Sequence, residues 1–166
     1  MSVRPILRFP DPCLRLPAEP VTRFDDALRS LASDLLETMR AAQGIGITAP
    51  HLGIRQRVVM LDRIGSAEPR CYVNPEIVWL DSAVIRAEEG SVSMPGVSEQ
   101  VERPARIRIT YRDLEGNPCS EEAADFRAVC LQHEIDQLDG MFWIYRLSRL
   151  KRDRLVKRYQ KLQHGG

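Results

Sequence analysis

Residues 130–140 read CLQHEIDQLDG, and this stretch decides what kind of fold the chain is expected to have. His133 and Glu134 begin the pattern H-E-x-x-H, but the position of its second histidine is occupied by Gln137. On a helix, residues four apart share one face, so His133 and the side chain at position 137 can reach the same ion. The stretch therefore predicts a helix that carries a metal-site pattern in which one ligand has changed.

The composition is that of one globular domain. The chain has 166 residues, and single domains commonly have about 100 to 200 residues, so we expect one domain over residues 1–166. A hydrophobic fraction of 43% suffices for a core, and the formal net charge of +1 argues against a general polyanion binder. There is no apolar signal segment and no run long enough to span a membrane. A cytoplasmic protein without membrane contact is expected.

Helical and strand patterns are both present. Apolar residues recur at helical spacing in three segments, 24–43, about 121–138 and 148–163. Strand composition occurs at residues 57–62, 71–80, 83–88 and 105–123, and a short strand is expected at 6–9. Gly44 and Gly140 are the expected glycines after the first and second helices. Strands flanked by separate helices indicate an α+β fold.

Two glycine-containing stretches precede the helix that carries His133. They read GIGITAPHLG at residues 44–53 and EEGSVSMPG at residues 88–96. Together with QHEIDQLDG at 132–140, they match, in order and spacing, the three motifs of peptide deformylases. The chain therefore resembles the peptide deformylase family, and the resemblance extends from ILRFPDPCLR near the N-terminus to the C-terminal helix.

The resemblance implies a fold, a reaction and a cofactor. Family members are α+β metallohydrolases with a central helix that carries H-E-x-x-H, and they remove the formyl group from N-terminal formylmethionine. Their metal, Fe(II) in the cell and often Zn or Ni in preparations, is held by one cysteine and the two helix histidines. A glutamine side chain and the backbone amide after the cysteine hold the formyl oxygen.

The family's functional residues are only partly present. Six positions match: Gly44, Gly46, Glu89, Gly90, His133 and Glu134. The metal cysteine falls on Ser91, the second helix histidine on Gln137, and the glutamine of the first motif on His51. Two of the three metal ligands and one donor to the formyl oxygen have therefore changed.

The remaining positions carry expected roles. The resemblance implies that Glu134 is the general base and that His133 is the remaining metal ligand, with Ser91 and Gln137 at the altered ligand positions. It implies ligand binding by Gly46, His51 and the backbone amide of Val92. It also implies a buried ion pair between Glu89 and Arg103, although ordinary pairing between strands would place these residues together equally well.

The changes at the ligand positions predict a loss of metal. A serine stays protonated near neutral pH, and a glutamine offers only a neutral carbonyl oxygen, so the site loses its one anion and an imidazole. We therefore expect no bound cofactor and no standard metal-dependent deformylation. We expect instead that the pocket binds a peptide N-terminus or a small acyl ligand.

Two hypotheses keep a hydrolase activity on N-formyl peptides or another small amide. In one, His51 replaces a lost ligand beside His133 and a metal of the family's kind is retained. In the other, Ser91 is a nucleophile, His133 is its base, and Glu89 or Glu134 orients the histidine.

The C-terminal segment is strongly basic. Residues 146–161 contain eight Lys or Arg residues and one acid, Asp153. Because family members have a similar basic helix, the resemblance implies contact with the ribosome near the peptide exit, where RNA phosphates attract cations. A charged helix face that is merely solvated is the alternative.

Overall fold

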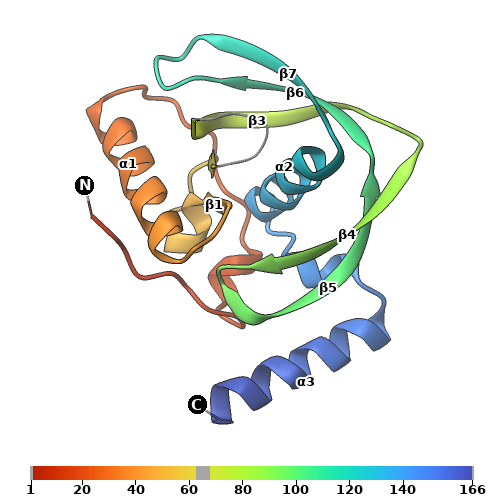
Figure 1. The fold of residues 1–166 in the computed structure, drawn as a ribbon. Helices are drawn as coiled ribbons and strands as arrows, with labels where there is room; N and C mark the ends of the chain where they lie inside the picture. Colours follow the sequence, from red (N-terminus) through yellow and green to blue (C-terminus); the bar gives the residue numbers. More distant parts are fainter. Residues whose placement is uncertain (1, 63–67, 166) are drawn as a thin grey trace.

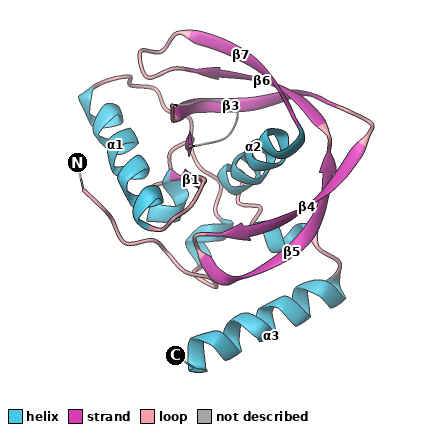
Figure 2. Ribbon diagram, in the orientation of Figure 1, coloured by secondary structure: helices cyan, strands magenta, loops and turns pink. Residues whose placement is uncertain are grey.

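In the computed structural model, which describes residues 2–62 and 68–165, strands and helices form separate layers (Figures 1 and 2). The predicted domain bounds of 1 and 166 lie outside the described residues. The helices are α1 (Asp26–Ala41), α2 (Asp125–Leu138) and α3 (Arg149–Gly165). The strands are β1 (Gly46–Thr48), β2 (Val58–Leu61), β3 (Arg70–Leu80), β4 (Val84–Ser91), β5 (Met94–Pro104), β6 (Arg106–Arg112) and β7 (Pro118–Ala124). The predicted α+β class is confirmed.

The strands form two antiparallel sheets. One has the order β1-β2-β3-β6-β7, and the other is the β4–β5 hairpin. Figure 1 shows α2 between the β3, β6 and β7 strands on one side and the hairpin on the other, with α3 outside the hairpin. None of the helices in the described part of the chain is long and apolar enough to cross a bilayer.

Helix α2 is buried because both sheets cover it. Its apolar residues Leu131 and Ile135 pack in one cluster with Ile107 and Ile109 of β6. The polar residues between them, including His133 and Glu134, are also buried. Since a buried polar side chain must find a partner or pay a desolvation cost, this helix is where functional chemistry is expected.

Some element boundaries differ from the predicted ones. Residues 121–123 were included in both a predicted strand and a predicted helix. Residues 121–124 lie on β7, where Glu121 is opposite Ile109. The chain turns into α2 at Asp125, which has φ +55° and donates its backbone N–H to Ala105 O at 2.9 Å. The antiparallel pairing with β6 therefore overrides the helix-forming composition of this segment.

The predicted short strand at residues 6–9 is not a strand. Leu7 and Phe9 donate backbone hydrogen bonds to His51 O and Ser93 O, two segments far apart in the sequence, so no ladder forms. These residues belong to the N-terminal arm, the segment that precedes α1. Through these two hydrogen bonds the arm connects the turn that carries His51 to the segment that carries Ser93.

The two glycines expected after helices have different roles. Gly140 is left-handed at φ +79°, as predicted, and a Cβ there would lie 2.6 Å from Arg15 O. After α1, the left-handed residue is Gln43 at φ +57° rather than Gly44. Gly44 is instead needed for packing, because a Cβ there would lie 2.8 Å from the Val92 side chain.

Candidate functional site

A cavity of about 280 Å³ lies where the three sequence motifs meet. Its lining combines residues of β1 and the turn after it, the end of β4, and α2. It includes six of the predicted site residues: Gly46, His51, Ser91, Val92, His133 and Glu134. Gln137 does not line it. Phe126, Val129 and Cys130 of α2 also line it, although the sequence motifs did not indicate them.

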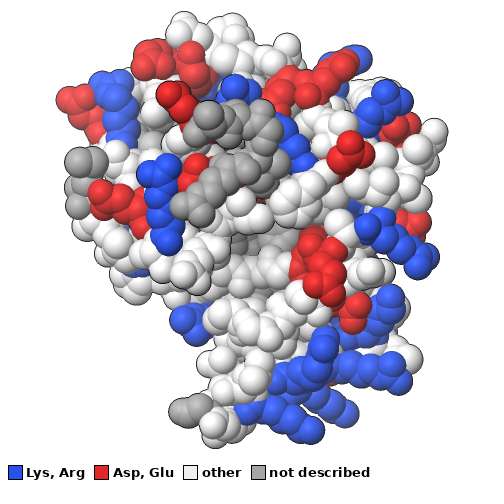
Figure 3. All heavy atoms as spheres, viewed as in Figure 1, with Lys and Arg blue, Asp and Glu red and all other residues white. Residues whose placement is uncertain are grey.

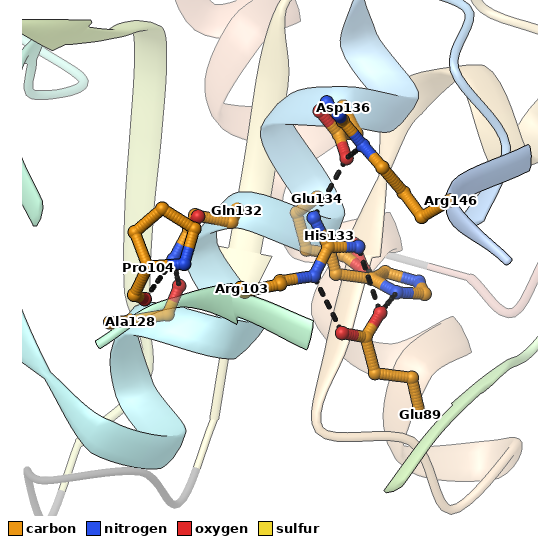
Figure 4. A network of polar contacts seen from close by, with 9 residues as sticks. All are labelled: Glu89, Arg103, Pro104, Ala128, Gln132, His133, Glu134, Asp136 and Arg146. Atoms are coloured by element: carbon orange, nitrogen blue, oxygen red, sulfur yellow. Dashed lines mark hydrogen bonds and ion pairs between the residues drawn. The ribbon is translucent and has the colours of Figure 1, made fainter. Parts of the chain in front are cut away.

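A chain of side chains with alternating charges contacts His133 at its Nδ1 atom (Figure 4). The His133 Nδ1 atom is 2.8 Å from Glu89 Oε1, and Glu89 accepts two hydrogen bonds from Arg103, at 2.5 and 2.9 Å. The next link is Arg103 Nη1, 2.8 Å from Asp136 Oδ2. Asp136 in turn accepts two hydrogen bonds from Arg146. The predicted Glu89–Arg103 pair is therefore present, and it is part of a longer network.

This network favours a charged His133. Burial opposes a carboxylate at Glu89, but the Arg103 hydrogen bonds and His133 lower the pKa of Glu89 to about 2. Burial likewise opposes a charged imidazole, yet the hydrogen bond to Glu89 and the charges of Glu134 and Glu89 raise the pKa of His133 above its usual value. Because a carboxylate can only accept, Nδ1 of His133 carries a proton that it donates to Glu89.

Glu134 faces the same cavity from α2. Its Oε1 lies 3.6 Å from His133 Nε2, and its Oε2 is buried without a hydrogen-bond partner in the part of the chain that the structure describes. Burial raises the pKa of Glu134 to about 7, although the nearby charge of His133 opposes the shift. Gly46 makes room for this side chain, because a Cβ at Gly46 would lie 3.2 Å from Glu134 Cδ. The carboxyl group can therefore accept or release a proton near neutral pH.

His51 enters the cavity from the turn after β1. Its Nδ1 accepts the backbone N–H of Thr48 at 2.9 Å, and Thr48 Oγ1 is also 2.9 Å from this nitrogen. Its Nε2 is buried and has no hydrogen-bond partner among the described residues. Burial, reinforced by the charge of His133, lowers the pKa of His51 to about 3, so the ring is neutral at ordinary pH.

The two altered ligand positions already have other partners. Gln137 Nε2 donates to Leu14 O at 2.7 Å, and Ser91 Oγ accepts the backbone N–H of Ser93 at 3.0 Å. Within residues 2–62 and 68–165, no three His, Cys, Asp or Glu side chains are grouped as a metal would require. A neutral hydroxyl, a neutral amide and a single imidazole do not fit a divalent metal of the family's kind.

The arrangement also bears on the predicted serine nucleophile. Ser91 and His133 line the same cavity, but among the described residues no hydrogen bond joins them. Glu89 orients the His133 ring, but the charged form that the network favours has no lone pair to accept a proton, and the serine is not hydrogen-bonded to it.

Asp136 and Arg146 were not predicted as part of the site. Asp136 is buried, and its carboxylate lies between two guanidinium groups. An aspartate on a buried helix needs a cation nearby to compensate its charge. The position of Asp136, two residues before the apolar Leu138, could therefore have indicated a buried ion pair from the sequence.

Comparisons with known proteins agree with the geometry. The family model described as "Polypeptide deformylase" matches residues 3–153. A "Peptide deformylase-like" protein of Brucella melitensis is 64% identical over 163 residues, which cover 98% of this chain and 99% of the relative. A "Peptide deformylase" of Maricaulis maris is 45% identical, with 98% and 95% covered.

Solved structures give the same result for the fold. The crystal structure of peptide deformylase from Ehrlichia chaffeensis in complex with actinonin has a TM-score of 0.91 and 37% identity, and the match covers 97% of this chain and 98% of that chain. The deformylase from Legionella pneumophila has a TM-score of 0.89 and 36% identity, with 98% of each chain covered. The predicted deformylase fold is confirmed.

Proposed function

Since the chain belongs to the peptide deformylase family, we propose that it binds the acylated N-terminus of a peptide, or a small acyl ligand, without metal-dependent hydrolysis. One observation carries the proposal. Gln137, at the position of a metal ligand, uses its amide to hold Leu14 O at 2.7 Å and does not line the cavity. The helix position that would complete a metal site therefore serves the packing of the N-terminal arm.

The cavity has the chemistry of a binding site for such a ligand. Polar groups of His51, Glu134 and His133 line it together with the apolar side chains of Phe126 and Val129. A few polar groups within an apolar lining are typical of small-ligand sites. The deformylase of Ehrlichia chaffeensis was solved with actinonin, a peptide mimic, and this supports a peptide-like occupant for the corresponding cavity here.

Hydrolysis through a rebuilt site is the second candidate. It is supported by Glu134, whose pKa of about 7 suits a general base near neutral pH. In family members the metal acidifies the attacking water and the base removes its proton. Without a metal, Glu134 would have to activate the water alone. The hypotheses with His51 as a ligand or Ser91 as a nucleophile belong to this same candidate.

One experiment separates binding from hydrolysis. The protein is purified anaerobically, its Fe, Zn and Ni are counted, and formate release from N-formylmethionyl-alanine is assayed beside calorimetric binding of that peptide. We expect saturable binding, far less than one metal per chain, and no formate above the blank. Stoichiometric metal with turnover contradicts the proposal, as does a failure to bind. Formate release without metal supports the second candidate.

A double variant tests whether the two ligand changes account for the proposed loss of metal binding. Ser91→Cys combined with Gln137→His restores an anionic thiolate and an imidazole one turn from His133. We expect this variant to bind close to one metal ion per chain, whereas each single variant binds much less. If the folded double variant remains free of metal, the cavity differs from the family's site in more than these two residues.

Ribosome contact by α3 is a further proposal, and it carries with it a cytoplasmic location. Leu155 and Tyr159 face inward, while Lys and Arg residues gather over the outer surface of the helix (Figure 3). Charge reversal at Lys157 and Lys161 should reduce co-sedimentation with ribosomes, and raised salt should have the same effect. Equal sedimentation of the variant and the parent protein would contradict the contact.

A further inference from the structure

Two arginine side chains approach one tyrosine ring at a place separate from the cavity. The guanidinium carbon of Arg15 lies 4.6 Å from the centroid of the Tyr145 ring, and that of Arg152 lies 5.3 Å from it. A guanidinium within about 6 Å of an aromatic ring is attracted by the ring's electrons. Tyr145 therefore holds two positive charges close together, and none of these three residues lines the cavity.

The fold fixes the backbone positions of the two arginines. Arg15 ends the short helical turn Pro12–Arg15, and its carbonyl oxygen packs so closely on Gly140 that a Cβ there would lie 2.6 Å away. Arg152 lies near the start of α3, where the buried Leu155 anchors the helix. The two guanidinium groups are therefore brought together by segments from opposite ends of the chain.

The two positive charges are not neutralised by an acidic side chain. Within residues 2–62 and 68–165, neither guanidinium is paired with a carboxylate, and neither donates a hydrogen bond. The neighbouring acid, Asp153, lies 4.0 Å from Arg149 Nε. Since like charges held close together repel each other, an anion between Arg15 and Arg152 would be bound favourably.

A groove of about 320 Å³ adjoins these charges. Tyr145 lines it together with the charged residues Arg152, Lys157 and Asp153 and the apolar residues Phe9, Ile144 and Val156. The Phe9 ring is stacked on Phe142, with 5.8 Å between the ring centroids, and its edge contacts Tyr159. The groove thus offers a well-packed apolar surface beside a positively charged end.

We propose that this groove binds a small phosphate monoester that carries an aromatic or apolar group. Each guanidinium can donate two parallel hydrogen bonds to phosphate oxygens, while the apolar group packs on Phe9 and Val156. Above its second pKa of about 6, a phosphate monoester has two negative charges, which match the two cations. A carboxylate or an RNA phosphodiester has one charge and leaves one guanidinium unmatched. The site is distinct from the cavity, so it does not rest on the proposed function.

Calorimetric titration of the parent protein with phenyl phosphate above pH 7 tests the site. We expect saturable binding of one molecule per chain. Methyl phosphate, which lacks the ring, and the phosphodiester uridylyl-uridine should each bind at least about tenfold more weakly. The inference is overturned by an absence of saturable binding. It is also overturned if uridylyl-uridine binds as tightly as phenyl phosphate, because the groove would then recognise RNA phosphate instead.

Charge variants identify the groups that hold the phosphate. Arg15→Gln and Arg152→Gln should each weaken phenyl phosphate binding about tenfold, in line with the loss of hydrogen bonds from a charged donor. Arg154→Gln is the matched control, because it makes the same change at an exposed position of α3 outside the groove, and it should bind like the parent protein. Equal weakening by Arg154→Gln and Arg152→Gln would mean that only the general charge of the helix attracts the anion, and it overturns the inference.

Two variants of Tyr145 test whether its ring positions the arginines. Tyr145→Phe keeps the ring and should bind like the parent protein, whereas Tyr145→Leu should bind about five- to tenfold more weakly. Equal binding by the two variants overturns the role of the ring.

Amide NMR spectra locate the bound molecule. Phenyl phosphate should shift the amide resonances of Phe9 and Val156 and leave that of Val129, in the cavity, unchanged. The reverse pattern places the compound in the cavity and overturns the inference. Unfolding curves of each variant verify that the protein is folded.

Discussion

His51 and Glu134 are buried ionisable side chains of one cavity, and burial moves their pKa values in opposite directions. The neutral form is favoured in each, so the pKa of His51 falls to about 3 and that of Glu134 rises to about 7. Between about pH 4.5 and 6.5 the two effects on stability oppose each other. Single substitutions should therefore reveal pH dependences of the unfolding free energy that largely cancel in the parent protein.

The His51→Gln substitution should remove a loss of stability in acid. Below its ordinary pKa of 6.5, His51 takes up a proton in the unfolded chain but not in the folded one, so acid favours unfolding. Two pH units, from 6.5 to 4.5, correspond to about 2.7 kcal/mol of unfolding free energy at about 1.36 kcal/mol per unit. Urea titrations of the parent and the variant over this range should differ by about that amount; parallel curves would contradict a neutral His51.

The Glu134→Gln substitution should have the opposite effect. The folded protein holds a proton on Glu134 up to about pH 7, whereas the unfolded chain releases it near pH 4.5, so stability falls as the pH rises between these values. The variant lacks this fall, which amounts to about 3 kcal/mol. The same urea titrations at pH 4.5 and pH 7 measure it. An unchanged slope would mean that Glu134 is already ionised in the folded protein.

Single residues show how far the sequence could predict the site. The motif spacing was enough to predict that His51, Ser91 and His133 lie at one cavity, and the family resemblance implied the Glu89–Arg103 pair. It could not indicate the contact of Gln137, because the Leu14 carbonyl that it holds is 123 residues away and presents no side-chain pattern. The His51 tautomer was equally hidden, since it depends on a backbone N–H.

Among the elements, β3 anchors the N-terminal arm through Asn74. Its Oδ1 accepts the Val21 N–H at 2.8 Å, and its Nδ2 donates to Val21 O at 2.9 Å. Asn74 itself has φ +51°, a left-handed conformation that asparagine tolerates better than most residues. The side chain thus substitutes for strand pairing at a point where the β3–β6 register is also shifted.

Substitution of Asn74 should weaken the attachment of the N-terminal arm to β3. Two variants separate the free energy lost with the hydrogen bonds from the free energy of the left-handed backbone. Asn74→Ala loses both hydrogen bonds and keeps an unfavourable left-handed backbone, so we expect a destabilisation of about 2 to 4 kcal/mol. Asn74→Gly loses the bonds without the backbone cost and should be about 1 kcal/mol more stable than the alanine variant. Hydrogen exchange should show faster exchange at the Val21 amide in both, and unchanged protection there would contradict the anchoring role.

The elements that the sequence predicted least well are strands whose formation depends on pairing with a neighbouring strand. Strand β5 has a polar, proline-containing sequence and was not among the predicted strands, but it pairs with β4 from Val84–Pro104 to Ser91–Met94. The amphipathic α1, by contrast, was predicted to within two residues at each end. Local periodicity identifies a helix that has one buried face, whereas an antiparallel strand depends on its partner.

Across the whole molecule, the cavity depends on packing from both ends of the chain. The N-terminal arm bonds to His51 O and Ser93 O, and Leu14 lies in one apolar cluster with Trp143 and with Leu155 of α3. The residues that line the cavity lie between these ends in the sequence. We therefore expect the chain to unfold as one cooperative domain rather than in parts.

Leu155→Ala tests this cooperativity. Leu155 is fully buried between α3 and the hairpin, so its truncation should cost about 2 to 5 kcal/mol. In a Trp79→Phe background, fluorescence reports only the buried Trp143, and it should lose its native signal at the same urea concentration as the far-UV circular dichroism. Both midpoints should fall together, while Leu150→Ala, at an exposed position of the same helix, should shift them by no more than about 0.5 kcal/mol. Separate midpoints would mean that α3 and its cluster form a unit that unfolds independently of the cavity.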